Sequence, residues 1–175
     1  MEDKLKKIKG IAFDIDGVMT DGSIFVASDG DILRTYDAKD SFAVRMANMR
    51  GYHTAVITGG RSESIRHRFV ECGVPYDDVY LASRDKIRDF KTFCERHGMQ
   101  PDEVMYFGDD LPDIPVLRAC GIGVAPADAV DEVKEAADYI SDYGGGKLCI
   151  RHAIEMVMRA QGRWVFEVEQ YERLY

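Results

Sequence analysis

The chain has 175 residues, 46% of them apolar and 31% charged, a balance typical of one soluble globular domain over residues 1–175. Its formal net charge of −8 argues against nucleic acid or an anionic membrane as a partner. Four cysteines without metal-ligand spacing indicate free thiols, and neither a signal peptide nor a membrane-spanning run is recognisable, so we expect a cytoplasmic protein.

The predicted elements alternate between strands and helices along the chain. An apolar run over 8–13 predicts a buried strand, and two strand-like runs at 23–28 and 31–36 flank Asp29-Gly30, a strong hairpin signal. Further strands are expected at 52–58, 79–82, 104–107, 121–124 and 139–140, and helices at 40–50, 62–72, 85–97, 114–119, 130–137 and 148–160. This alternation predicts an α/β fold, with a Rossmann-like parallel sheet and helices on both faces.

Polar side chains gather where the predicted strands end. A pair such as Asp14 and Asp16 before Gly17 can simply be turn chemistry, because Asp and Gly commonly break strands. Four such groups nevertheless occur in one short chain: Asp14 with Asp16, Thr58, Lys86 near the start of a helix, and Asp109 with Asp110 and Asp113. In parallel sheets of this class ligands bind beyond the carboxyl ends of the strands, so we expect these groups to form one site.

These residue types suit phosphoryl transfer, in which catalysis needs charge neutralisation and positioning. Asp14 and Asp109 can hold Mg²⁺, which prefers hard oxygen ligands, and Asp110 and Asp113 could bind the metal directly or through water. Asp113 could instead stabilise the first turn of a helix without touching metal. The sequence therefore predicts a magnesium site held by Asp14 and Asp109. Whether Asp110 and Asp113 also bind the metal stays open from the residues alone.

The remaining groups suit the phosphate itself. Lys86 can cancel charge on a phosphoryl oxygen and on the nucleophile, and Thr58 with nearby backbone N–H groups can donate to the other oxygens. One aspartate of the early pair can act as nucleophile and give an aspartyl-phosphate. The other can then protonate the leaving oxygen and later deprotonate water.

The residues that carry this chemistry resemble, in their order, the four motifs of the haloacid-dehalogenase-like phosphatases. The matching segments are Asp14-Ile15-Asp16-Gly17-Val18, Thr58, Lys86 and Gly108-Asp109-Asp110-Leu111-Pro112-Asp113. The resemblance implies that Asp14 is the nucleophile and that Asp16 is the general acid/base, whose backbone carbonyl also binds Mg²⁺. It further implies that Thr58 and Lys86 bind phosphate and that Asp109 completes the metal site.

Other segments are similar to the small capless branch of this family, namely Asp21-Gly22, the 23–36 hairpin, Tyr36-Asp37-Ala38-Lys39-Asp40 and the late Gly-Gly-Gly. That branch implies a phosphatase of lipopolysaccharide sugar synthesis, acting on an eight-carbon 2-keto-3-deoxy sugar-acid phosphate or, alternatively, a nine-carbon one. The substrate-binding residues that it implies are Asp16, Asp40, Ser41, Arg45, Gly59, Arg61, Arg68 and Lys86. Many members have Arg directly after Thr-Gly, where this chain has Gly60, so Arg61 is expected to take that role. Each of these arginines could equally be a solvated helix residue.

The predicted site has no room for a cap domain of its own. Neither the interval from Asp16 to Thr58 nor that from Thr58 to Lys86 can hold a further domain of roughly 50 residues beside its core elements. We therefore expect a homo-oligomer, a homotetramer by the resemblance, with active sites at subunit boundaries. The hairpin (residues 23–36) and the aromatic tail (residues 161–175) are the candidate contacts.

Two other function classes stay open from the residues alone. A phospho-receiver domain also uses an acidic pair, a phosphorylated Asp, a Thr and a Lys on an α/β sheet. Here Asp16 follows Asp14 and supplies an acid/base that a receiver lacks. A catalytically silent interaction module would have no need for Asp16 or Lys86.

Overall fold

Strand β1 (Gly10–Phe13) lies inside a six-stranded sheet whose order is β5–β4–β1–β6–β7–β8. The other strands are β4 (His53–Ile57), β5 (Val79–Tyr80), β6 (Val104–Phe107), β7 (Ile122–Ala125) and β8 (Tyr139–Ile140). All pairings in this sheet are parallel, and β1 pairs with β4 on one side and β6 on the other. The computed structural model describes residues 1–164, and the predicted parallel sheet is confirmed.

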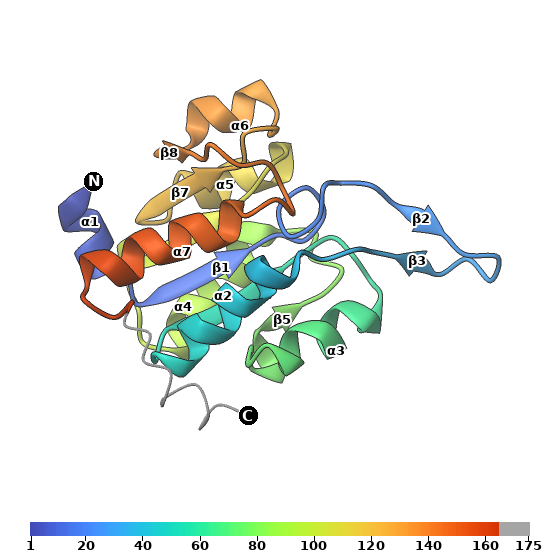
Figure 1. The fold of residues 1–175 in the computed structure, drawn as a ribbon, viewed down its shortest axis with the longest axis horizontal. Helices are drawn as coiled ribbons and strands as arrows, with labels where there is room; N and C mark the ends of the chain where they lie inside the picture. Colours follow the sequence, from blue (N-terminus) through green and yellow to red (C-terminus); the bar gives the residue numbers. More distant parts are fainter. Residues whose placement is uncertain (165–175) are drawn as a thin grey trace.

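Helices cover both faces of the sheet (Figure 1). One face is covered by α1 (Glu2–Lys7), α2 (Ala38–Met49), α3 (Glu63–Glu71) and α7 (Cys149–Ala160), and the other by α4 (Lys86–Arg96), α5 (Ile114–Leu117) and α6 (Asp131–Ala136). Because strand side chains alternate, Ile11 and Phe13 of β1 pack on the first face and Ala12 on the second. β1 is therefore buried on both sides, which is why its sequence is continuously apolar.

The hairpin leaves the sheet between β1 and α2 and projects beside α3 (Figure 1). Its antiparallel strands β2 (Phe25–Val26) and β3 (Ile32–Leu33) have two residues each, shorter than the predicted runs at 23–28 and 31–36. Phe25 and Val26 are 62% and 71% exposed, so little packing supports the ribbon within this chain. The predicted protruding hairpin is confirmed, but regular pairing extends only over its middle.

Two local differences from the prediction have simple causes. Residues 2–7 form α1, which the sequence did not predict because Leu5 is the single buried side chain in a charged segment. The predicted helix at 114–119 is the shorter α5, preceded by the 3₁₀ turn η3 (Leu111–Asp113). Two further 3₁₀ turns, η1 (Tyr76–Asp78) and η2 (Pro101–Glu103), lead into β5 and β6.

Among the described helices, none has the length and apolar character needed to cross a membrane.

Candidate active site

Lys86 lies at the centre of a buried charge cluster at the carboxyl edge of the sheet. Its Nζ is 2.7 Å from Oδ2 of Asp14, which follows β1, and 2.7 Å from Oδ1 of Asp113 in η3. Lys86 is the first residue of α4, and the Asp85 side chain caps that helix by accepting from a backbone N–H. Burial alone would lower the pKa of Lys86, but the two carboxylates raise it, so Lys86 stays a cation.

Asp113 is completely buried, and both of its oxygens have donors. Oδ1 accepts from the Tyr106 hydroxyl at 2.6 Å and from Lys86, while Oδ2 accepts from the N–H groups of Asp109 at 3.2 Å and Asp110 at 3.3 Å. Its side chain does not cap α5. These contacts make Asp113 a residue that positions Lys86 and the Asp109–Asp110 turn, and its binding of metal stays a prediction.

Asp109 differs from Asp113 because its buried Oδ1 has no hydrogen-bond partner among the described residues. Burial, followed by the charges of Asp14 and Asp113, raises the pKa of Asp109 to about 8. Burial also raises the pKa of Asp14 to about 6, with Lys86 opposing the shift and Asp113 adding to it. One lysine does not offset this concentration of carboxylates, so the site favours a further cation.

The donor set fits a magnesium ion. Asp14, Asp109 and Asp113 each offer an oxygen, and these atoms all lie within 4.8 Å of one another. Hard carboxylate oxygens with room for water are what Mg²⁺ prefers. Gly17 has a φ of +85°, and a Cβ at this position would overlap the Asp109 carboxylate. Glycine is thus required here both by the backbone and by the space that Asp109 occupies.

Thr58 brings the end of β4 to the same edge. It is 1% exposed, its N–H donates to the Tyr80 carbonyl, and its Oγ1 accepts from the N–H of Gly60 at 3.1 Å. A hollow of about 410 Å³ opens here and contains most of the predicted site residues: Asp14, Asp16, Thr58, Gly59, Lys86, Asp109, Asp110 and Asp113. The structure thus brings the four sequence clusters together in a space large enough for a phosphate and part of its ester.

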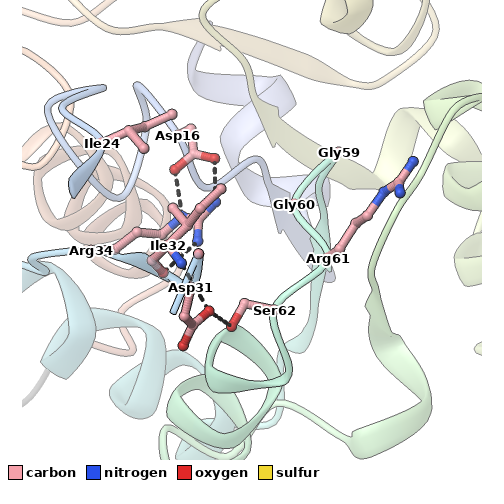
Figure 2. Close-up of a pocket in the computed structure, with 10 residues that line it drawn as sticks. Asp16, Ile24, Asp31, Ile32, Arg34, Gly59, Gly60, Arg61 and Ser62 are labelled. Atoms are coloured by element: carbon pink, nitrogen blue, oxygen red, sulfur yellow. Dashed lines mark hydrogen bonds and ion pairs between the residues drawn. The ribbon is translucent and has the colours of Figure 1, made fainter. Parts of the chain in front are cut away.

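Asp16 contacts Arg34 of the hairpin (Figure 2). Arg34 Nε donates to Asp16 Oδ1 at 2.7 Å, and Nη2 donates to Oδ2 at 2.9 Å. Both residues line a second hollow of about 550 Å³, which shares Asp16, Gly59 and Gly60 with the first. Sequence reasoning missed Arg34, because nothing in its spacing shows that the hairpin folds back onto Asp16.

Two further residues of the first hollow were also missed. Ser83 and Arg84 lie between β5 and α4 and line the hollow beside Lys86. Ser83 donates to Oδ2 of Asp89 at 2.6 Å, which orders the turn that leads into α4. Their position directly after a predicted strand and before Lys86 could have indicated that they line the site.

Asp40, expected at the substrate, contacts another helix of the fold. It is completely buried and lines neither hollow. Its two oxygens accept from the backbone N–H groups of Leu148 at 2.9 Å and Arg151 at 2.8 Å. Asp40 therefore caps the start of α7 from another helix, and its contact with substrate stays a prediction.

Four other predicted substrate residues lie outside the hollow that contains Lys86, namely Ser41, Arg45, Arg61 and Arg68. Ser41, Arg45 and Arg68 line a third hollow on α2 and α3, and the Ser41 hydroxyl donates to the Asp37 carbonyl. Arg61 lines the second hollow, but its side chain points away from Asp16 and Arg34 (Figure 2). Contacts of these residues with substrate stay predictions.

Comparisons with known proteins agree with this geometry. A family model of haloacid dehalogenase-like hydrolases matches residues 61–144. The 3-deoxy-D-manno-octulosonate 8-phosphate phosphatase KdsC of Escherichia coli (strain K12) is 31% identical over 91% of this chain and 84% of its own length. The KdsC of Haemophilus influenzae is 31% identical over 97% of this chain and 94% of its own length.

Solved structures with the same fold include phosphatases with bound metal. The 3-deoxy-D-manno-octulosonate 8-phosphate phosphatase of Moraxella catarrhalis, in complex with magnesium, phosphate and KDO, has a TM-score of 0.89 and 26% identity, covering 98% of this chain and 95% of that one. The cobalt-bound phosphatase of Haemophilus influenzae has a TM-score of 0.89 and 31% identity, covering 95% and 97%. These relatives favour an enzyme over a phospho-receiver or a silent module. The chain belongs to the haloacid dehalogenase-like hydrolases, as its four motifs predict.

Proposed function

We propose that this protein is a Mg²⁺-dependent phosphatase that hydrolyses 3-deoxy-D-manno-octulosonate 8-phosphate to the free sugar acid and phosphate. The observation that carries the proposal is the buried contact of Lys86 with Asp14, beside the unpartnered carboxylate oxygen of Asp109. A nucleophile, a phosphate-binding cation and a metal ligand are then adjacent. The similarity to phosphatases with this substrate, over nearly the whole chain, supports the choice of substrate.

The proposal gives each catalytic group a role that the geometry supports. The backbone N–H of Ile15 donates to Asp14 Oδ1 at 2.7 Å, which fixes the carboxylate for attack through its other oxygen on phosphorus. Asp14 thereby becomes the aspartyl-phosphate while the sugar oxygen leaves with a proton from Asp16. Asp16 then takes a proton from the water that attacks phosphorus, the bond between Asp14 and phosphorus breaks, and inorganic phosphate leaves with the Asp14 carboxylate regenerated.

Lys86 and Thr58 would bind the phosphoryl oxygens during both steps. Lys86 can donate to a phosphoryl oxygen without leaving Asp14, because an ammonium group has three donors. Mg²⁺, held by Asp14 and Asp109 with the predicted backbone carbonyl of Asp16, would neutralise phosphoryl charge when bound. Burial of the cluster excludes water from these charges and strengthens their effect on the reaction.

A substrate panel tests the proposal directly. We expect the highest kcat/KM for the eight-carbon sugar-acid phosphate when it is compared with a nine-carbon 2-keto-3-deoxy sugar-acid 9-phosphate and with glucose 6-phosphate. The Asp14→Asn variant, purified in the same way, controls for contaminating phosphatases. A higher kcat/KM for either competitor would overturn the assigned substrate, and activity in excess chelator would overturn the role of Mg²⁺.

We also propose that the protein is a homo-oligomer, specifically a homotetramer, with active sites at subunit boundaries. The support is the exposed apolar hairpin: Ile24, Phe25, Val26 and Leu33 are each more than half exposed. The other candidate contact, the aromatic tail, lies outside the described residues from position 165 onward. Four free cysteines fit the cytoplasm as its proposed location.

A further inference from the structure

The contact between Asp16 and Arg34 joins the hairpin to the chemistry of the site. The guanidinium bonds both oxygens of the carboxylate, at 2.7 and 2.9 Å, which is the bidentate geometry that fixes the orientation of both groups. The Arg34 side chain is only 4% exposed, whereas that of Asp16 is 29% exposed. A guanidinium with so little access to water depends on its partner, so this pair is part of the folded structure rather than a surface contact.

The surroundings of Arg34 leave it no other carboxylate among the described residues. Its Nη1 donates weakly to the Ile32 carbonyl at 3.4 Å, and no further bond of its side chain is formed within the described chain. A Cβ at position 60 would lie 3.2 Å from Nη2, so Gly60 provides the space in which the guanidinium sits. Arg34 therefore occupies the place next to Asp16 that a side chain at position 60 would otherwise enter.

Asp16 lies on the border between the two hollows. It lines the hollow that contains Lys86 and also the hollow under the hairpin. Each carboxylate oxygen has two lone pairs, and Arg34 uses one on each oxygen. The remaining lone pairs can still take part in proton transfer, so the contact does not block acid/base chemistry.

We propose that Arg34 is a positioning residue, which acts from the hairpin by holding the Asp16 carboxylate in the orientation that serves the leaving oxygen. The inference rests on the proposed function, because it takes Asp16 as the general acid for hydrolysis of a phosphate ester. It assigns to the hairpin a direct link with the chemical step. Arg34 itself is not required to touch the substrate.

This role has a consequence that depends on the leaving group. The leaving group of an alkyl phosphate, such as a sugar phosphate, is an unstable alkoxide, so its departure needs the proton from Asp16. The leaving group of p-nitrophenyl phosphate is a stable phenolate, which departs without such a proton. The value of kcat/KM reports the first step, in which the leaving group departs, so it separates the two cases even if hydrolysis of the aspartyl-phosphate limits kcat.

The experiment compares Arg34→Gln and Arg34→Lys with wild type on both substrate types. We expect Arg34→Gln to lose about 10²-fold in kcat/KM on the alkyl phosphate, near the lower end of the effect of a general acid, with little change on p-nitrophenyl phosphate. Arg34→Lys should lie between, because lysine keeps the charge but not the bidentate fork. Arg118→Gln, at an exposed position beyond α5, removes the same charge elsewhere and is expected to change neither value.

A double-mutant cycle tests whether Arg34 acts through Asp16. In an Asp16→Asn background, Arg34→Gln should cost nothing further on the alkyl phosphate. The double variant removes both charges of the pair, so it leaves no unpaired buried ion and guards against a single variant that fails to fold. A full additional loss in this background would overturn the proposal, as would equal losses on both substrate types in the single variant.

The assigned substrate can fail without deciding the role of Arg34. If wild type does not hydrolyse the eight-carbon sugar-acid phosphate, the proposed substrate is wrong. The same comparison is then made with the alkyl phosphate that wild type hydrolyses best. The leaving-group dependence of the Arg34 variants still supports or refutes the positioning role.

Discussion

The sheet edge and the hairpin satisfy their side chains in opposite ways. At the sheet edge, Lys86, Asp14 and Asp113 are buried and paired at 2.7 Å, and Asp113 has donors on both oxygens. In the hairpin, Phe25 and Val26 are 62% and 71% exposed. In the first region these three charges pair within one chain, whereas the second exposes apolar surface that the described residues 1–164 do not cover.

This difference indicates that the sheet edge and the hairpin have separate roles in the protein. The rigid sheet edge carries the reacting groups, because catalysis requires charges held in place before the substrate arrives. The exposed apolar side chains of the hairpin are the basis of the proposed contacts between subunits. The Arg34–Asp16 pair connects the two regions, so their independence can be tested from either side.

The largest effect is expected at the sheet edge. Asp14→Asn replaces the nucleophilic carboxylate by an amide, which neither attacks phosphorus well nor binds metal as an anion. We expect turnover to fall on the order of 10⁴- to 10⁶-fold, the scale for losing a central catalytic group. Single-turnover assays with a sugar phosphate measure this loss. Wild-type kcat in this variant would contradict the covalent mechanism.

The cluster of side chains at the sheet edge could be predicted from the sequence. Asp14, Thr58 and Asp109 each follow an apolar strand, and parallel strands bring such positions to one edge, so their convergence follows from the pattern alone. Lys86 was placed in the same way, from its position near the start of a helix that follows a strand.

The sequence could not show contacts that depend on how distant segments dock. Asp40 accepts from the backbone N–H of Leu148, 108 residues later, and this contact could not be read from the sequence, where the family resemblance alone indicated a role for Asp40. Arg34 meets Asp16 only because the hairpin turns back on itself. Neither contact leaves a periodic signal. Both arise from tertiary packing that short-range patterns do not contain.

A large stability effect is expected from Asp113→Ala, because it removes the acceptor for four donors. The buried Tyr106 hydroxyl loses its partner, Lys86 loses one of its two carboxylates, and the Asp109–Asp110 turn loses its cap. Breaking a buried pair in this way costs about 3–5 kcal/mol in the free energy of unfolding. Urea unfolding of Asp113→Ala measures it.

The neighbouring Asp110→Ala is the matched control for this loss. Asp110 is exposed, and its side chain accepts from the N–H of Leu111, so the expected cost is about 1 kcal/mol, as for a lost cap. Equal losses in the two variants would show that the buried bonds of Asp113 do not add to the stability of the fold.

A smaller effect is expected from magnesium, and it should depend on pH. The raised pKa values, about 6 for Asp14 and about 8 for Asp109, mean that the metal-free folded chain binds protons that the unfolded chain releases above about pH 4. Their contribution to stability is present at low pH and is lost as the pH rises towards 8. Mg²⁺ replaces these protons, so its stabilisation should grow over the same range.

Thermal unfolding with Mg²⁺ or chelator, near pH 6 and near pH 8, measures this dependence. At a concentration about 100 times Kd, binding adds about 2.7 kcal/mol, or on the order of 5–10 °C in Tm for a chain of this length. Asp109→Asn should lose most of the shift and its pH dependence. A shift that is larger near pH 6 than near pH 8 would contradict the assignment of these carboxylates to the metal.

The smallest effect on the fold is expected in the hairpin, where the largest effect on assembly should occur. Phe25→Ser combined with Val26→Ser changes two exposed side chains, so the free energy of unfolding of the subunit should move by about 0.5 kcal/mol or less. If these side chains are buried between subunits, the same change should dissociate the oligomer. Light scattering across a dilution series, paired with kcat/KM, measures both.

Ile140→Ser, an exposed apolar position on the edge strand β8, is the control that should leave assembly unchanged. An unchanged oligomer in the hairpin variant would contradict the role of the hairpin in assembly, and a fully active wild-type monomer at high dilution would contradict active sites at subunit boundaries.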